Sequence, residues 1–287
     1  MNSKNRARIR MVISAAAFGT IPLFVRALSL TSSEIALYRA VIATMLIGSC
    51  LMFSHEKTAF SVIKKELPLL LFSGVAIGFN WILLFEAYRY TTVSEATLCY
   101  YFAPIIVTLA CTVIFRETLK PHQIICFAMS TLGVVLIVAA GEGGAAQNRA
   151  LGIVMGLGAA LLYASVELIN KFIKNVGGIQ RTFYQFLAAV VVLLPYVALT
   201  DGFHLDTLVW NGWVNLLILG IFHTGITYFL YFSSLKELPG QEASILSYID
   251  PLVAIILSVA ALGESVTPLQ VLGGVLVIGF ALWNELG

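Results

Sequence analysis

Charged residues are scarce in this sequence, at 11% of 287 residues. Soluble domains carry about 25% charged side chains. Hydrophobic residues make up 59% of the chain, and its mean hydropathy is +0.93. This shortage of charge excludes an ordinary soluble domain and indicates an integral membrane protein whose surroundings are the lipid bilayer.

Patterns typical of enzymes and nucleic-acid-binding proteins are also missing. The four cysteines, at positions 50, 99, 111 and 126, lie in apolar stretches without metal-ligand spacing, and we expect packed thiols. The sequence offers no nucleophile beside a base, no phosphate-binding glycine loop and no basic face for nucleic acid. We therefore expect no enzymatic activity, no metal, no cofactor and no nucleic-acid partner. A nucleotide-binding domain is not encoded, so ATP-driven transport is not expected.

Apolar windows of spanning length fill nearly the whole chain. A membrane-spanning helix needs about 20 mostly apolar residues. Ten windows qualify: 9–28, 33–53, 67–90, 95–115, 121–140, 151–173, 179–200, 210–234, 242–262 and 268–285. They lack the alternation of barrel strands, so helices are expected. The basic, then apolar start resembles a signal peptide, but Pro22 and Arg26 stand where a cleavage site would need small residues. The predicted fold class is an all-α integral membrane protein with ten transmembrane helices.

The distribution of basic residues predicts the orientation. Ten spans place both termini on one side of the membrane. If that side is cytoplasmic, 13 of the 17 lysines and arginines lie inside, and only Arg26, Arg39, Arg89 and Arg149 do not. Cytoplasmic loops carry an excess of basic residues. We therefore expect a multi-pass protein of the cell inner membrane with both termini in the cytoplasm.

The two halves of the chain repeat each other at an offset of 147 residues. The offset relates six pairs within a short stretch: Glu95 and Glu242, Tyr101 and Tyr248, Pro104 and Pro251, Glu117 and Glu264, Pro121 and Pro268, and Gln123 and Gln270. Each unit holds five spans, an odd number, so the second unit must enter the membrane from the opposite side. The predicted organisation is a first five-helix repeat at 1–140, a linker at 141–150 and a second, inverted repeat at 151–287. Inverted repeats are characteristic of secondary transporters.

Residues 91–123 and 238–282 carry a resemblance to a known family. Both have a polar helix start with Glu-Ala, a mid-helix proline, a Glu at the far end and a Pro-x-Gln that opens a glycine-containing helix. This pattern resembles EamA-type transporters of the drug/metabolite transporter superfamily. The resemblance implies a ten-helix carrier, usually an exporter, with a central cavity lined by helices 1, 3, 4, 6, 8 and 9.

Asp250 is the leading candidate site residue. It lies inside an apolar run, and ionisable residues within membranes mark functional sites or paired polar groups. Pro251 removes a helix hydrogen bond to the Ser247 carbonyl and opens the backbone beside the carboxylate. The offset pairs Asp250 with Ala103, so the helix-breaking prolines, Pro104 and Pro251, are structural whereas the aspartate occurs in one copy. The alternative is that Asp250 only fixes packing through a polar neighbour.

Two further candidates are ionisable. Glu167 forms a polar stripe with Tyr163, Asn170 and Lys171, although its spacing from Lys171 also fits an intrahelical ion pair. His223 lies near the expected midplane, where an imidazole could shuttle protons or serve as a packing hydrogen-bond donor.

Aromatic and polar side chains complete the candidate site. The offset places Asn80 and Trp81 opposite Thr227 and Tyr228, and such pairs would suit an amine through cation–π contacts. Tyr101 and Tyr248, with Tyr100, flank the two prolines and could line the cavity or pack in the core.

The remaining intramembrane charges are expected to be structural. Arg26 and Arg39 can snorkel to the outer surface, and Glu86 can pair with Arg89 or Arg39. Glu95 and Glu242 lie at helix starts, where carboxylates are favoured. With Glu117 and Glu264 they occur in both copies, which indicates a role in the architecture.

The predicted function is secondary active transport, with export as the expected direction. A small metabolite, such as an amino acid or an amine-bearing compound, would cross by alternating access, and protons are a candidate coupling ion. Asp250 would bind the positive group of the substrate or exchange a proton with it. Two alternatives are a non-transporting membrane sensor or partner protein, and a lipid flippase, which would need a lateral opening and clustered cations.

Overall fold

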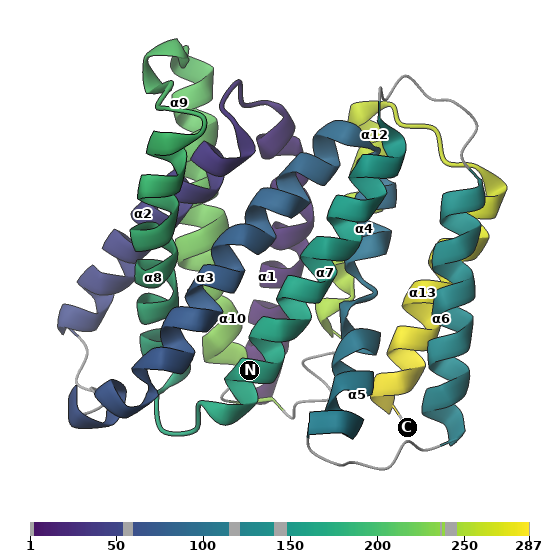
Figure 1. Cartoon of the computed structure of the whole chain (residues 1–287), viewed down its shortest axis with the longest axis horizontal. Coiled ribbons are helices and arrows are strands. Elements are labelled where there is room, and N and C mark those ends of the chain that lie inside the picture. Colours follow the sequence, from purple (N-terminus) through teal and green to yellow (C-terminus); the bar gives the residue numbers. More distant parts are fainter. Residues whose placement is uncertain are drawn as a thin grey trace.

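The helices of this chain form one bundle in which long elements cross the molecule side by side (Figure 1). A computed structural model describes residues 3–53, 60–114, 121–140, 148–235, 237–238 and 246–286, and these residues contain helices and no strand. The elements of the first half are α1 (Ser3–Arg26), α2 (Ser32–Phe53), α3 (Phe60–Tyr90), α4 (Val93–Tyr100), α5 (Ala103–Ile114) and α6 (Pro121–Ala139). Those of the second half are α7 (Arg149–Phe172), α8 (Gly178–Leu199), η1 (Leu205–Thr207), α9 (Trp210–Leu217), η2 (Ile218–Ile226), α10 (Thr227–Leu235), α12 (Ile249–Leu262) and α13 (Pro268–Leu286).

Three expected spans are not single regular helices. The span at 242–262 is interrupted at Tyr248, just before α12. The span at 95–115 is divided between α4 and α5, at the position of Pro104. The span at 210–234 runs through α9, the π-helix η2 and α10. The span at 67–90 is a single helix, but it begins earlier than expected because α3 continues back through Lys64 and Lys65 to Phe60. Length and hydropathy predicted these apolar stretches, but they do not detect interruptions inside them.

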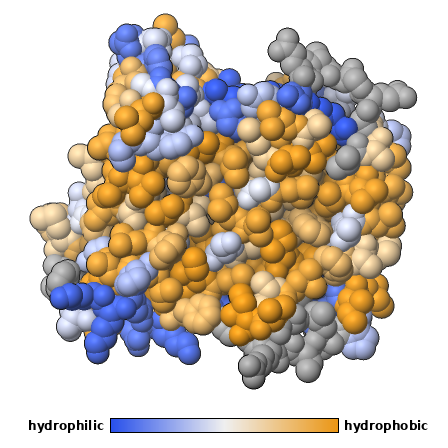
Figure 2. Space-filling model, in the orientation of Figure 1, coloured by the Kyte–Doolittle hydropathy of each residue, from blue (hydrophilic) through white to orange (hydrophobic). Residues whose placement is uncertain are grey.

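Apolar surface dominates the middle of the molecule. Seven of the described helical stretches are long and apolar enough to cross a membrane, and three shorter apolar helices lie at Pro121–Ile137, Ile249–Leu262 and Pro268–Asn284. Figure 2 shows a broad hydrophobic band between two hydrophilic ends. The two ends of the chain lie at the same end of the bundle (Figure 1). The chain is thus a multi-pass membrane protein, while ten spans and an inverted second half stay predictions.

Glycines allow the closest helix contacts. A Cβ atom on Gly133 of α6 would lie 2.6 Å from the carbonyl oxygen of Gly273 on α13, and the reverse substitution would meet the same obstacle. These two helices lie side by side at one edge of the bundle (Figure 1). On α7, a Cβ on Gly152 would approach Thr91 to 2.8 Å, and one on Gly156 would approach Cys99 to 3.2 Å. Small residues at such interfaces allow membrane helices to pack tightly, and Gly152 and Gly156 are spaced four residues apart on one face of α7.

Candidate functional site

Two helix interruptions meet inside the bundle. Between α4 and α5 the helix is broken at Tyr101 and Phe102, just before Pro104, and ahead of α12 it is interrupted at Tyr248, just before Pro251. Proline lacks the N–H that a continuous helix needs at this point. The rings of Tyr101 and Tyr248 lie 5.9 Å apart between centroids. The duplicated prolines therefore place two interrupted helices against each other.

Asp250 lies at this junction. The Tyr101 hydroxyl donates a 2.6 Å hydrogen bond to Asp250 Oδ2. Asp250 is in the first turn of α12, where the positive end of the helix favours a carboxylate. Its side chain is partly exposed, and among the described residues Oδ1 has no hydrogen-bond partner. One carboxylate oxygen is thus held in place while the other is available.

Tyrosines from several helices surround the carboxylate. Tyr100 lies 5.9 Å from Tyr101 and 5.4 Å from Tyr163 of α7, measured between ring centroids. Tyr88 of α3 and Tyr228 of α10 are within electrostatic range of Asp250. We refer to the following six residues as the tyrosine cluster: Tyr88, Tyr100, Tyr101, Tyr163, Tyr228 and Tyr248. The cluster brings several aromatic rings and hydroxyl groups close to Asp250.

The polar stripe of α7 contacts two neighbouring helices, α5 and α8. Glu167 is exposed and interacts electrostatically with Tyr163 of the cluster. Lys171 Nζ donates to Cys111 Sγ of α5 at 2.9 Å, and Asn170 Oδ1 accepts from Gln185 Nε2 of α8 at 2.9 Å. The stripe therefore combines packing contacts, at Asn170 and Lys171, with an acid beside the tyrosine cluster.

Arg39 lies where the sequence did not place it. Its side chain is 2% exposed, so it does not snorkel to the surface as expected. The guanidinium carbon lies 4.3 Å from the Trp81 ring centroid and 5.3 Å from that of Phe85, and Nε donates to Thr224 Oγ1 at 3.0 Å. Snorkelling needs an open path to water, and α2, α3 and η2 close that path around Arg39.

The predicted polar-aromatic pairs are engaged by the protein itself. Asn80 Nδ2 donates to the Ala159 carbonyl oxygen of α7 at 2.6 Å. Trp81 packs edge-to-face against Phe186, with ring centroids 5.3 Å apart, and Arg39 covers it. A protein cation, Arg39, thus lies over the Trp81 ring, and a role of Trp81 in binding a substrate cation stays a prediction. Tyr228 remains within the tyrosine cluster.

His223 is enclosed and hydrogen-bonded at both ring nitrogens. It is 1% exposed, with Nε2 2.7 Å from Thr20 Oγ1 of α1 and Nδ1 3.2 Å from the Ile218 carbonyl oxygen. The Ile218 contact joins residues five apart, which is the spacing of the π-helix η2. The Phe24 ring lies 4.7 Å away between centroids. This geometry favours the packing interpretation of His223 over the proton-shuttle interpretation.

Glu264, one of the acids that occur in both halves of the sequence, joins several helices. Its carboxylate forms a 2.8 Å ion pair with Arg26 of α1 and accepts the backbone N–H of Val93 at 3.0 Å, at the start of α4. Ser94 Oγ lies 2.5 Å from Ser258 Oγ at the same junction. Glu264 therefore joins α1, α4 and the end of α12. Glu117, which the repeat pairs with Glu264, and Glu242, which it pairs with Glu95, lie outside the described residues.

Glu95 forms a second ionic contact near this end. Arg149 of α7 pairs with Glu95 at 2.7 Å, and Gln270 of α13 donates to the same carboxylate at 2.5 Å. The expected pairing of Glu86 with Arg89 is present at 3.8 Å. Glu95 and Glu264 thus act in the architecture, as their repetition predicts, through ion pairs that the repeat does not reveal.

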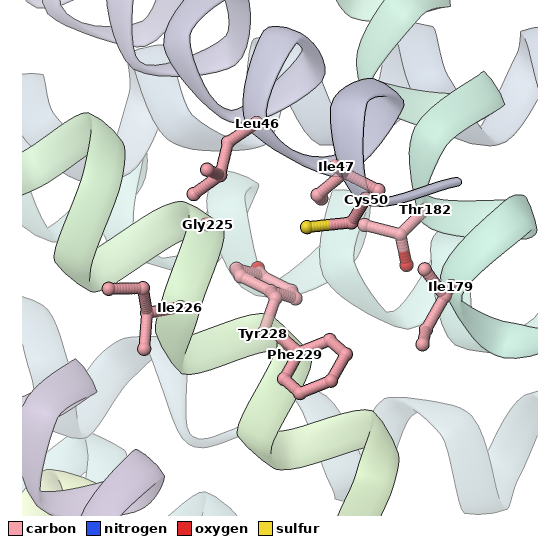
Figure 3. A pocket seen from close by; sticks show the side chains of 9 residues that line it. All are labelled: Leu46, Ile47, Cys50, Ile179, Thr182, Gly225, Ile226, Tyr228 and Phe229. Carbon is pink, nitrogen blue, oxygen red and sulfur yellow. The ribbon is translucent and has the colours of Figure 1, made fainter. Parts of the chain in front are cut away.

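An apolar pocket lies between α2, α8 and the η2–α10 segment and shares Tyr228 with the tyrosine cluster. Its volume is about 160 Å³, and Figure 3 shows its lining: Leu46, Ile47, Cys50, Ile179, Thr182, Gly225, Ile226, Tyr228 and Phe229. Cys50 is exposed, which corrects the expectation that all four cysteines are packed. The pocket has no charged side chain and so lacks the headgroup-binding cations that a lipid flippase would need. Nowhere in the described part of the chain do three metal-ligating side chains gather.

Comparison with known proteins identifies relatives along the entire chain. The profile of the EamA-like transporter family matches residues 6–139 and 150–284. "Uncharacterized transporter YxxF" of Bacillus subtilis (strain 168) is 34% identical over 97% of this chain and 89% of its own. "Uncharacterized inner membrane transporter YicL" of Salmonella typhimurium is 25% identical over 97% and 94%. A solved crystal structure with 18% identity superposes with a TM-score of 0.67 over 97% of this chain and 96% of that chain, which shows a shared fold.

Proposed function

This chain belongs to the EamA-like transporter family, and we propose that it is a secondary active transporter that exports small metabolites such as amino acids or amines. The observation that carries the proposal is the Asp250 carboxylate at the junction of the two interrupted helices. One of its oxygens accepts from Tyr101 at 2.6 Å, and the other has no partner among the described residues. An available carboxylate inside a membrane protein can bind an ammonium group or a proton.

Alternating access gives this position its function. Tyr101 lies in the first family match and Asp250 in the second, so a substrate bound between them contacts both halves of the chain. Rocking of the halves around a fixed site is the usual motion of transporters built from repeats. The ion pairs of Glu264 and Glu95 close one end of this junction and would part when that end opens.

The expected orientation places both termini in the cytoplasm, because most basic residues then lie on the inner side. The end closed by Glu264 and Glu95 would then be the outer end. Energy would come from the substrate gradient or from protons exchanged at Asp250.

Counterflow in proteoliposomes tests this function. Proteoliposomes that contain the purified protein are loaded with unlabelled amino acids or amines. Uptake of the labelled compound is then compared between wild type and Asp250→Asn. We expect wild-type counterflow, reduced roughly 10- to 100-fold in the variant, because a hydrogen bond to a charged group contributes about 1.5–3 kcal/mol. Glu86→Gln is the matched control, since Glu86 pairs with Arg89 outside the tyrosine cluster.

Two results would contradict the proposal. Equal counterflow by wild type and Asp250→Asn would remove Asp250 from the mechanism. A wild-type protein that binds ligands but shows no counterflow would favour the non-transporting sensor instead.

A further inference from the structure

Arg39 is a buried cation that forms no ion pair with any residue the structure describes. It is 2% exposed, and it contacts the rings of Trp81 and Phe85 and the hydroxyl of Thr224. Within the described ranges, its one hydrogen bond is donated by Nε. Among the residues that the structure describes, neither terminal nitrogen of the guanidinium has a hydrogen-bond partner, and no carboxylate lies within 4.0 Å. Burying a charge is costly unless it is paired, so a cation kept in this state calls for an anion.

Arg39 and Asp250 interact with the same tyrosine side chains. Tyr88, Tyr100 and Tyr228 each interact electrostatically with Arg39 and also with Asp250. The two opposite charges therefore flank one group of tyrosines. They form no ion pair with each other. Oδ1 of Asp250 and the terminal nitrogens of Arg39 have no hydrogen-bond partner in the described part of the chain.

We propose that Arg39 is the anion-binding subsite of the transport site, so that the substrate carries a carboxylate for Arg39 and an ammonium group for Asp250. This rests on the proposed transport function and narrows its substrate class to zwitterions with both groups. A planar guanidinium presents paired N–H donors that match the two oxygens of a carboxylate. Trp81 and Phe85 support the guanidinium plane from the side, and the Thr224 bond fixes Nε, so the terminal nitrogens are pre-positioned.

Binding measurements on the purified chain test the subsite independently of transport. The probes are four compounds with one common side chain: leucine, leucine methyl ester, the decarboxylated amine isoamylamine, and N-acetyl-leucine. The set is repeated with phenylalanine and its three matching derivatives. We expect the free amino acid of at least one set to raise the unfolding temperature at roughly 30-fold lower concentration than its ester or amine, because leaving one partner of a buried charge pair unmatched costs 2 kcal/mol or more.

Arg39→Met and Arg39→Lys separate a ligand role from a packing role. Arg39→Met removes an unpaired buried charge, so the unliganded variant should unfold at or above the wild-type temperature while losing the preference for a free carboxylate. Arg39→Lys should keep the charge and bind the amino acid more weakly than wild type, since an ammonium cannot pair in the same planar geometry. Arg8→Met, at an exposed position near the start of α1, is the control and should behave as wild type.

The binding, stability and counterflow measurements distinguish a ligand role of Arg39 from a packing role. The proposal is overturned if wild type shows no preference for the free carboxylate in either set, or if Arg39→Met keeps that preference. It is also overturned if Arg39→Met unfolds well below wild type and Arg39→Lys restores both stability and binding in full, which is the result of a packing role. Carboxylate-dependent binding without counterflow would support the subsite and contradict transport. Counterflow of ester and amine as fast as the amino acid would support transport and overturn the subsite.

Discussion

Tyr101 and Asp250 are 149 residues apart in the chain, yet the hydroxyl of one donates a 2.6 Å hydrogen bond to the carboxylate of the other. Each residue lies beside a helix interruption, and each interruption precedes a proline. Interrupted helices are where membrane transporters form polar sites, because backbone and side-chain polar groups are then exposed inside the protein. The contact between Tyr101 and Asp250 therefore marks the junction of the two halves.

The Tyr101–Asp250 bond should be measurable as a coupling energy. We expect Tyr101→Phe and Asp250→Asn each to change the free energy of unfolding, and the double variant to reveal a coupling of about 1.5–3 kcal/mol, the range for hydrogen bonds to charged groups. The measurement is unfolding of the four proteins in detergent without substrate. Strict additivity of the two changes would show that the bond contributes nothing to stability.

Loss of the Glu264 charge should loosen the contact between α1, α4 and the end of α12. Glu264→Gln weakens the pair with Arg26, which is partly exposed, by about 1 kcal/mol, equivalent to roughly fivefold more of an open state. The readout is labelling of Ser258→Cys by a membrane-impermeant thiol reagent in a chain whose four native cysteines are replaced. Ser258 is fully buried at this junction, so labelling reports its opening.

The ion pair between Arg10 and Glu237 supplies a control for the labelling experiment. Its nitrogen and oxygen atoms lie 2.6 Å apart, and Arg10 is near the start of α1. Glu264 instead pairs with Arg26, at the end of α1. Glu237→Gln should leave labelling of Ser258→Cys unchanged. Equal labelling with and without Glu264→Gln would show that Glu264 does not hold this end closed.

The Gly133–Gly273 contact should tolerate no side chain. In Gly133→Ala the new Cβ would lie 2.6 Å from the Gly273 carbonyl oxygen, so we expect a loss of about 1–3 kcal/mol of stability from overpacking. Gly279→Ala, also on α13, is the matched control because nothing lies within 4 Å of its Cβ. That change should stabilise the helix by roughly 0.5–1 kcal/mol. Thermal unfolding measures both, and a neutral Gly133→Ala would contradict the contact.

His223 should act in packing. His223→Gln keeps hydrogen-bonding groups but cannot titrate near neutral pH, and we expect it to lower stability by about 1–3 kcal/mol through imperfect replacement of the bonds to Thr20 and Ile218. Any dependence of transport on an imposed pH gradient should persist. Thr20→Val removes one of these bonds without altering the imidazole and should give a similar loss of stability. A variant as stable as wild type that no longer responds to the gradient would identify His223 as a proton carrier instead.

Much of the fold could be predicted from local sequence features. Apolar windows located the helices, and Pro104 and Pro251 located the interruptions, because a missing N–H acts within one helical turn. The π-helix η2 escaped prediction, since its polar side chains bond to carbonyls five residues back only after neighbouring helices enclose them. Thr224 and Thr227 each make such a bond.

The candidate site was predicted less completely than the fold. The intramembrane position of Asp250 was enough to single it out, whereas Arg39 was assigned to the surface because distance along a helix does not reveal what covers it. Trp81 was recognised as a cation-binding ring, and the structure supplies Arg39 as a cation. The acid in the same helix, Glu34, is five residues from Arg39, and only the tertiary structure shows which side chains surround the guanidinium.

The sequence by itself determined that this chain is a helical membrane protein of repeated design, that its helices break before two prolines, and that one copy alone carries an aspartate there. Those properties follow from hydrophobic length and from the covalent structure of proline, which act locally. The tertiary structure decided which side chains surround each buried charge. Arg39 lies over Trp81 and Asp250 beside Tyr101 because helices distant in the chain pack together, and the energy of a buried charge depends on the groups that surround it.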